Sequence, residues 1–217
     1  MLGVAIVALW LAMVLAMALL VRHRWPQQRE WSRKLVHIGT GPVVLLAWGF
    51  GIGRGIALPV ALLVTAATAF NHRYQLLPAV EDVGRHSYGT VAYGASISIL
   101  LALYWPQQPL AVAAGVLVMA FGDGLAGLVG PAVASRRWSL WGQTKSLAGS
   151  GCMLLAGLAV VGLLTVLAGA TGQPAPPAAA CLGLALLATA LEQWSVFGVD
   201  NLTVPVLTGV LWQHWSA

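Results

Sequence analysis

The sequence predicts an all-α protein, a polytopic bundle of about eight transmembrane helices that form a single membrane domain over residues 1–217. Hydrophobic residues make up 59% of the chain and charged residues only 8%, whereas soluble domains are about one quarter charged. The mean hydropathy is +0.83. Apolar runs long enough for a membrane helix, which needs about 20 residues, recur from one end of the chain to the other.

The first apolar run, residues 2–21, is expected to be a retained membrane helix rather than a cleaved leader. The first basic residues, Arg22 and Arg24, follow the run, and none precedes it. This arrangement favours a helix whose N-terminus lies outside. The chain as a whole is expected to contain spans near 2–21, 35–51, 55–71, 88–105, 109–128, 147–169, 178–194 and 202–215.

Proline and glycine mark the boundaries between the later spans. The stretch "WPQQP" (105–109) divides one long uncharged segment, and "TGQPAPP" (171–177) divides another. Both residue types end helices, because proline lacks an N–H and glycine costs backbone entropy. These two breaks therefore separate the fourth span from the fifth and the sixth from the seventh.

The basic residues indicate how the bundle is oriented. If eight spans alternate, the loops 22–34, 72–87 and 129–146 share one side, and they hold ten of the eleven Lys and Arg residues. By the positive-inside rule that side is cytoplasmic, so both termini are expected outside. All six acidic residues fall on the same side, which indicates a polar reaction site there. The net charge of +5 then reflects topology, and we expect no nucleic acid partner.

The stretch "VMAFGDGLAGLVG" (118–130) places Asp123 between Gly122 and Gly124 in an apolar run. A carboxylate at membrane depth costs about 2.5–3.5 kcal/mol, so it needs a compensating partner. We expect Asp123 about a turn and a half from the inner end of its helix, facing a cavity that water reaches. It could bind Mg²⁺, which takes carboxylate and phosphate oxygens, and the glycines would let a ligand approach. The alternative is a carboxylate paired with a nearby arginine.

Two further stretches carry polar groups at inner helix ends. In "GQTKSLAGS" (142–150), Lys145 precedes a helix whose first turns hold Ser146 and Gly149, an arrangement that can bind phosphate. The alternative is a membrane-flanking lysine followed by a serine cap. In "LEQWSVFGVDNLTVP" (191–205), two acids and an amide could share a metal with Asp123 or orient a hydroxyl group, and the alternative is that Asp200 or Asn201 is a helix N-cap. The residues in question are Glu192, Asp200 and Asn201.

Two stretches nearer the N-terminus hold further candidates. In "SRKLVHIGTG" (32–41), Arg33 and Lys34 could contact phosphate, and His37 is either a base or a hydrogen-bonded packing group. In "EDVGRHSYGT" (81–90), Arg85 is a further candidate phosphate ligand.

Five of these motifs, taken in order, resemble the polyprenol kinase family and its phytol kinase branch in particular: "RKLVH", "EDVGRHSYGT", "FGDGLAGLVG", "KSLAGS" and "EQWSVFGVDNLTVP". Dolichol kinases and CDP-diacylglycerol synthases are similar at a greater distance. The resemblance covers residues 31–205, a kinase-like core that follows an N-terminal span and basic loop at 1–30.

The resemblance implies an enzyme that transfers the γ-phosphoryl group of CTP, with Mg²⁺, to a phytol-like isoprenoid alcohol dissolved in the bilayer. The active site of this multi-pass membrane protein would lie on the cytoplasmic side. Residues carried over as catalytic are Asp123, Lys145, Glu192 and Asp200, with Asp123 and Asp200 as metal ligands. Residues carried over or assigned to nucleotide binding are Gly122, Gly124, Ser146, Gly149, Asn201, Arg33, Lys34 and Arg85.

Two other functions compete with this interpretation. A cytidylyltransferase that makes a CDP-lipid would use the same nucleotide and metal but would attack the α-phosphate. A transporter of anionic solutes or lipids would show inverted repeats and charged groups near the membrane midplane. No repeat is evident and the acids gather at one face, which disfavours the transporter.

Overall fold

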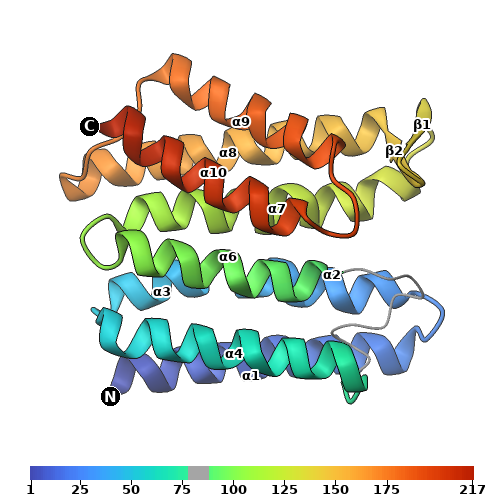
Figure 1. Ribbon diagram of the computed structural model, residues 1–217, viewed down its shortest axis with the longest axis horizontal. Coiled ribbons are helices and arrows are strands. Elements are labelled where there is room, and N and C mark those ends of the chain that lie inside the picture. Colours follow the sequence, from blue (N-terminus) through green and yellow to red (C-terminus); the bar gives the residue numbers. More distant parts are fainter. Residues whose placement is uncertain (78–87) are drawn as a thin grey trace.

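Long helices run side by side along the length of the molecule in the computed structural model (Figure 1). The structure describes residues 1–77 and 88–217. The helices are α1 (Leu2–Arg24), α2 (Arg29–Thr40), α3 (Val43–Gly49), α4 (Arg54–Tyr74), α6 (Gly89–Tyr104), α7 (Pro109–Ala132), α8 (Leu147–Thr171), α9 (Ala178–Gln193) and α10 (Asp200–Ser216). Two short strands, β1 (Arg137–Leu140) and β2 (Gln143–Ser146), lie between α7 and α8 in the chain.

The predicted helical class is confirmed, because every apolar run expected to be a span is helical. The second run is divided into α2 and α3 at Gly41-Pro42, where the proline has no N–H for the helical ladder. In the part of the chain that the structure describes, α1, α4, α7 and α8 are long and apolar enough to cross a membrane. Eight crossings, with both termini outside, stay a prediction.

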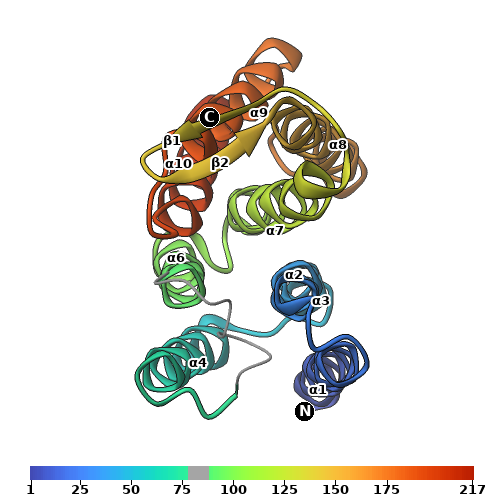
Figure 2. The same ribbon diagram turned by 90° about the vertical axis from the view of Figure 1, so that its right-hand side faces the viewer.

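Helix α7 lies at the centre of the bundle (Figure 2). It packs against α8, α10, α2, α6, α3 and α9, and its residues from Leu110 to Ala120 are buried. Gly115 permits the close approach of α10, since a Cβ there would lie 2.2 Å from the carbonyl oxygen of Pro205. A helix surrounded in this way is apolar on every face. The central position of α7 therefore explains why its polar residue, Asp123, must find partners on neighbouring helices.

Two expected helix boundaries are wrong, and both errors affect candidate residues. Helix α2 begins at Arg29, so Arg33 and Lys34 lie inside a helix and are buried against its neighbours, not in a loop. Helix α7 continues to Ala132, which places Asp123 nine residues, or about two and a half turns, from the end of the helix. In α2 the charged residues, and in α7 the glycines, had indicated a helix boundary. Tertiary packing extends both helices past these boundaries.

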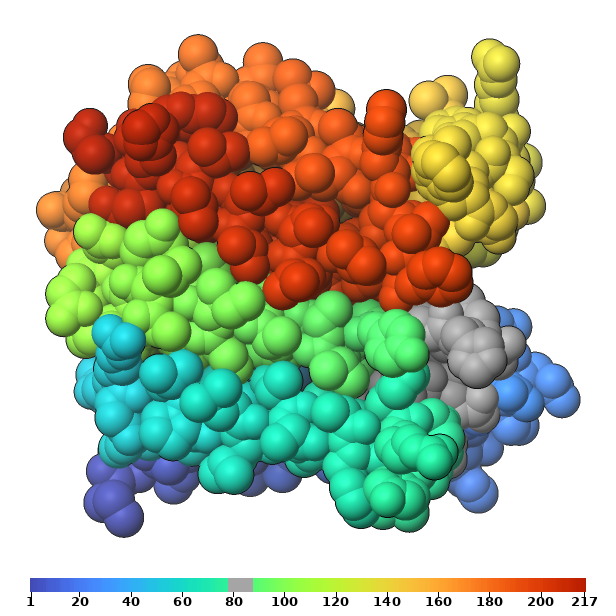
Figure 3. Space-filling model, viewed as in Figure 1, coloured from blue at the N-terminus to red at the C-terminus, as the bar shows by residue number. Residues whose placement is uncertain are grey.

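The expected loop 129–146 contains a β-hairpin. Strands β1 and β2 pair antiparallel, with Leu140 opposite Gln143 and Arg137 opposite Ser146. The two turn residues, Trp141 and Gly142, have φ angles of 52° and 77°. A two-residue turn with both φ angles positive matches the right-handed twist of the paired strands. The hairpin projects at one end of the molecule, whereas both chain termini lie toward the other end (Figures 1 and 3).

Candidate active site

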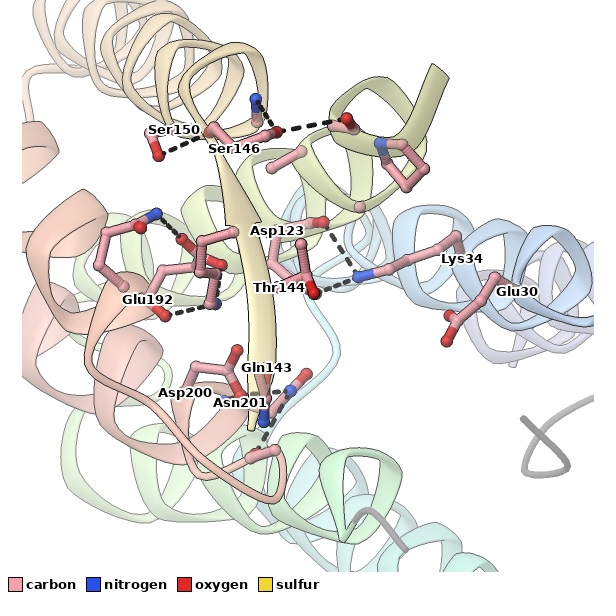
Figure 4. Close-up of a pocket in the computed structure, with 18 of the residues that line it drawn as sticks. Glu30, Lys34, Asp123, Gln143, Thr144, Ser146, Ser150, Glu192, Asp200 and Asn201 are labelled. Atoms are coloured by element: carbon pink, nitrogen blue, oxygen red, sulfur yellow. Dashed lines mark hydrogen bonds and ion pairs between the residues drawn. The ribbon is translucent and has the colours of Figure 1, made fainter. Parts of the chain in front are cut away.

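A polar cavity of about 400 Å³ lies at the hairpin end of the bundle (Figure 4). It is built from the ends of α2, α7, α8, α9 and α10 that lie nearest the hairpin, together with the hairpin itself. Nine residues that the sequence indicated line this cavity: Arg33, Lys34, Asp123, Lys145, Ser146, Gly149, Glu192, Asp200 and Asn201. Segments from four distant parts of the chain thus contribute to one site.

Three buried carboxylates come together in the cavity, from three different helices. Asp123 belongs to α7, Glu192 to α9 and Asp200 to α10, and one oxygen from each lies within 4.8 Å of the others. Negative charges gathered this closely away from water require positive charge nearby. The oxygen donors suit Mg²⁺, which prefers carboxylates and phosphate oxygens. The buried Oδ1 of Asn201 has no hydrogen-bond partner among the described residues, so it is a fourth oxygen available beside Asp200.

Lys34 neutralises Asp123. Its Nζ lies 2.6 Å from Asp123 Oδ2 and donates to the Asp123 carbonyl oxygen at 3.0 Å. Gly127 makes this approach possible, because a Cβ at that position would lie 2.4 Å from Cε of Lys34. The partner of Asp123 is therefore a lysine of α2, whereas the sequence had suggested an arginine as the structural alternative.

Lys145 forms the second buried ion pair. It lies on β2, and its Nζ contacts Oε1 of Glu192 and donates to the Glu192 carbonyl oxygen at 2.7 Å. The other carboxylate oxygen of Glu192 accepts from Gln193 Nε2 at 2.6 Å. Alternation along β2 leaves Gln143 and Lys145 less exposed than Thr144, on the side of the strand that packs inward. The strand rather than the helix start therefore positions this lysine.

The N-terminus of α8 is satisfied within the protein. The N–H groups of Leu147, Ala148 and Gly149 donate to Arg136 O, Ser135 Oγ and Ser146 Oγ, respectively. Ser146 is the N-cap of the helix, which is the structural alternative that the sequence offered for it. These three amides are thus occupied in this structure, and any phosphate contact here depends on side chains such as Lys145.

Arg33 is buried and pairs with Glu30, one turn earlier on α2. Its Nε and Nη2 donate to Glu30 Oε2 at 3.1 and 2.8 Å. Burial opposes the charge of the guanidinium, but the nearby carboxylates of Glu30 and Asp123 outweigh it and raise the pKa of Arg33. Arg33 therefore holds a permanent positive charge in the wall of the cavity.

His37 lies beside the carboxylates but outside the polar cavity. Its Nε2 is 3.4 Å from Asp123 Oδ2 and 3.3 Å from the Met119 carbonyl oxygen, and its ring lies 4.3 Å from that of Tyr93. It lines a second, apolar cavity. Both expected roles thus remain compatible with its position, since it is packed and hydrogen-bonded and also adjoins Asp123.

Gly122 and Gly124, which were expected to contact the nucleotide, are not among the residues that line the polar cavity. A Cβ at Gly122 would lie 2.4 Å from Sδ of Met153, and one at Gly124 would lie 2.3 Å from Cγ1 of Ile38. Their absent side chains bring α8 and α2 close to α7. Arg85, the remaining candidate, lies outside the described residues.

The hairpin adds cavity residues that the sequence interpretation missed: Arg137, Gln143 and Thr144. They fall between the stretches "FGDGLAGLVG" and "KSLAGS", in a segment for which the sequence indicated no site residue. The signal that could have revealed them is the dipeptide Trp141-Gly142 between two four-residue stretches that contain Trp, Leu and Thr, which is typical of a hairpin. Their amide, hydroxyl and guanidinium groups are candidate contacts for the parts of a nucleotide beyond its phosphates.

The chain is similar to several curated proteins named as phytol kinases. It is 37% identical over 205 residues to a phytol kinase of Synechocystis sp., a match that covers 94% of this chain and 87% of that protein. It is 29% identical over 199 residues to probable phytol kinase 1 of Glycine max and 28% identical over 146 residues to probable phytol kinase 3 of the same plant. These two matches cover 65% and 44% of the plant proteins, which is less than two thirds of their length. No family model and no solved structure matches the chain.

Proposed function

The chain belongs to the phytol kinase family, and we propose on that basis that it transfers the γ-phosphoryl group of CTP to a phytol-like alcohol in the membrane. The first relative covers nearly the whole chain and is named as a phytol kinase. The observation that carries the proposal is the group of three buried carboxylates, Asp123, Glu192 and Asp200, in a cavity that also holds Lys34 and Lys145. This donor set suits a metal-bound nucleoside triphosphate.

The carboxylates would hold Mg²⁺ through Asp123 and Asp200, with Glu192 and the free oxygen of Asn201 beside them. When bound, the metal neutralises the charge that develops on the transferred phosphoryl group. The cations of the cavity would contact phosphate oxygens, with Lys145 nearest the hairpin and Arg33 nearest the apolar cavity.

Phosphoryl transfer through a loose transition state depends mainly on position and charge, so a strong base is not required. Asp123 and His37 lie 3.4 Å apart, between the polar cavity and the apolar one. Either could accept the proton that the alcohol loses as its oxygen bonds to phosphorus.

The test is a direct assay of the purified protein with Mg²⁺ and a panel of isoprenoid alcohols. CTP and ATP are compared, each labelled separately on the γ-phosphate and on the base. We expect a phosphorylated alcohol and CDP from CTP. Formation of a CDP-lipid with release of pyrophosphate would identify a cytidylyltransferase instead. Absence of any product with every alcohol and both nucleotides would contradict the proposal.

The basic residues of the hairpin and of the α1–α2 loop support a cytoplasmic position for the site. Nucleotide would then reach the polar cavity from the cytoplasm, and the alcohol would reach it from the bilayer.

A further inference from the structure

An apolar cavity of about 250 Å³ lies between the N-terminal helices and α6, on the other side of Arg33 from the polar cavity. Its walls come from α1, α2, α3, α4, α6 and α7. Apart from Arg33, His37 and a few hydroxyl groups at the hairpin end, its lining consists almost entirely of apolar side chains. Ligand sites in proteins combine an apolar interior with a few polar groups placed where the ligand is polar.

The helices around this cavity fall into two groups. Helix α1 packs on α2 and α3, whereas α4 packs on α6 (Figure 2). Ile56, Val60 and Val64 occur at intervals of four residues on α4, so they share one face of the helix, and they line the cavity. Their exposed fractions are 47%, 46% and 49%, because α4 leaves this side unpacked. An apolar face of this kind at membrane depth is suited to a hydrocarbon chain.

The two cavities meet at α2. Arg33 lines both of them, and His37, which lines the apolar one, lies 3.4 Å from Asp123, which lines the polar one. A molecule that fills the apolar cavity would therefore present its end to the carboxylate and cation group. This end is where the phosphoryl acceptor must be if the proposed function is correct.

We propose that the apolar cavity binds the hydrocarbon tail of the isoprenoid alcohol, places its hydroxyl group beside Arg33 and His37, and limits the length of the tail. This inference rests on the proposed function, and it adds the position of the lipid site and the feature that selects its substrate.

Buried side chains line the far end of the cavity: Ile52, Leu101 and Trp105. Trp105 is buried there and donates from Nε1 to the Ile52 carbonyl oxygen at 2.8 Å, which joins the end of α6 to the turn after α3. Leu101 lines the same end. A tail that runs straight along the cavity would therefore contact Leu101 and Trp105 at its end.

The length of the cavity follows from the helix rise. His37 and Ala47 on α2 and α3 are ten residues apart, and Ile56 and Thr68 on α4 are twelve apart, which corresponds to about 15–18 Å. An extended chain of single bonds advances about 1.1–1.2 Å per bond, so the main chain of phytol or geranylgeraniol, about sixteen carbons, spans roughly 17–18 Å. An extended tail of four isoprene units thus matches the cavity in length, and part of it would lie against the half-exposed face of α4, because the cavity volume of about 250 Å³ is smaller than such a tail.

The experiment places a larger side chain on α4 at the far end of the cavity, which reduces the space for the tail. Ala57 lines the cavity near its far end, and Ala57→Phe would occupy volume that the last isoprene unit needs. Leu63→Phe is the matched control, because Leu63 is 70% exposed on the same helix and does not line the cavity. Values of kcat/KM are measured with geraniol, farnesol and geranylgeraniol, which differ by one isoprene unit each.

We expect Ala57→Phe to lower kcat/KM for geranylgeraniol at least about tenfold relative to geraniol, since a misfit of a few carbons in an apolar pocket has this size. Retained activity on geraniol shows that the variant is folded, and Leu63→Phe should leave all three values near wild type. Equal kcat/KM changes for the three alcohols, or no change at all, would overturn the inference.

A photoreactive isoprenoid alcohol, with a diazirine at the tail end, tests binding without turnover in phosphatidylcholine vesicles. We expect labelled residues in 54–61 and 97–105, and competition by unlabelled geranylgeraniol. Labelling elsewhere would overturn the inference, and labelling here that geranylgeraniol does not reduce would show that the cavity takes up bilayer lipid without selecting isoprenoids. If the wild-type protein phosphorylates no alcohol, the proposed function fails, and the labelling pattern still decides whether the cavity binds isoprenoids.

Discussion

The pairing of Asp123 with Lys34 leads to a prediction about stability and activity together. Asp123→Asn keeps the shape of the side chain and removes its charge, which leaves the ammonium group of Lys34 buried without a counter-ion. The two side chains are 12% and 5% exposed, respectively. Removing one partner of such a pair costs about 3–5 kcal/mol, and we expect ~3 because the asparagine oxygen still accepts a hydrogen bond.

A second variant separates the two effects. Lys34→Met combined with Asp123→Asn removes both charges, so most of the lost stability should return, to within ~1 kcal/mol of wild type. Activity should not return, because the metal ligand is still missing. We expect kcat/KM to fall by about 10²–10³-fold or more in both proteins.

The measurements are thermal and denaturant unfolding in detergent, with phosphoryl transfer assayed on the same preparations. Glu30→Gln is the comparison variant: Glu30 is 39% exposed, and the buried Arg33 still has the carboxylate of Asp123 nearby, so its loss should cost less than that of Asp123. Near-normal activity of Asp123→Asn would refute the role of Asp123 in the reaction. Recovery of activity in the double variant would mean that Asp123 serves only to neutralise Lys34.

Three further predictions concern the phosphates, the metal and the orientation of the protein. Lys145→Ala should lower kcat/KM for the nucleotide far more than it weakens binding of the alcohol, and Lys145→Arg should recover part of the loss; an effect on KM for the alcohol alone would place Lys145 at the lipid entrance. Asp200→Asn should raise the Mg²⁺ concentration needed for half-maximal activity by about tenfold or more, as titration after chelation would measure, and an unchanged requirement would remove Asp200 from the metal site. A single cysteine at Ser139, in a protein whose native cysteines are replaced by alanine, should react with a membrane-impermeant maleimide only from the cytoplasmic side of sealed vesicles; labelling from the outer side alone would reverse the topology.

The carboxylate group illustrates how far a site can be predicted from a membrane sequence. Asp123 stands out because a charge in an apolar run is costly, and Glu192 and Asp200 stand out because they lie at helix ends on the same expected side. These are local signals, and they indicated that the three acids could share a metal. The structure brings their oxygens within 4.8 Å of one another. Their assignment as metal ligands remains a prediction.

The partners in the two buried ion pairs could not be predicted from the sequence. Lys34 and Asp123 are 89 residues apart in the chain, and Lys145 and Glu192 are 47 apart. Which cation reaches which acid depends on how the helices pack, and glycines such as Gly127 decide it by allowing close approach. For the same reason, the sequence could not show that Gly122 and Gly124 bring α8 and α2 close to α7.

The sequence by itself determined the helical class, the positions of the apolar helices and the residue types of the polar end. Each of these follows from a local property, namely apolar run length, proline and glycine breaks, or the cost of a charge at depth. The hairpin, the partner of each charge and the apolar cavity beside Arg33 and His37 were decided only by the tertiary structure. They depend on distances between segments far apart in the chain, and those distances exist only once the helices have packed around α7.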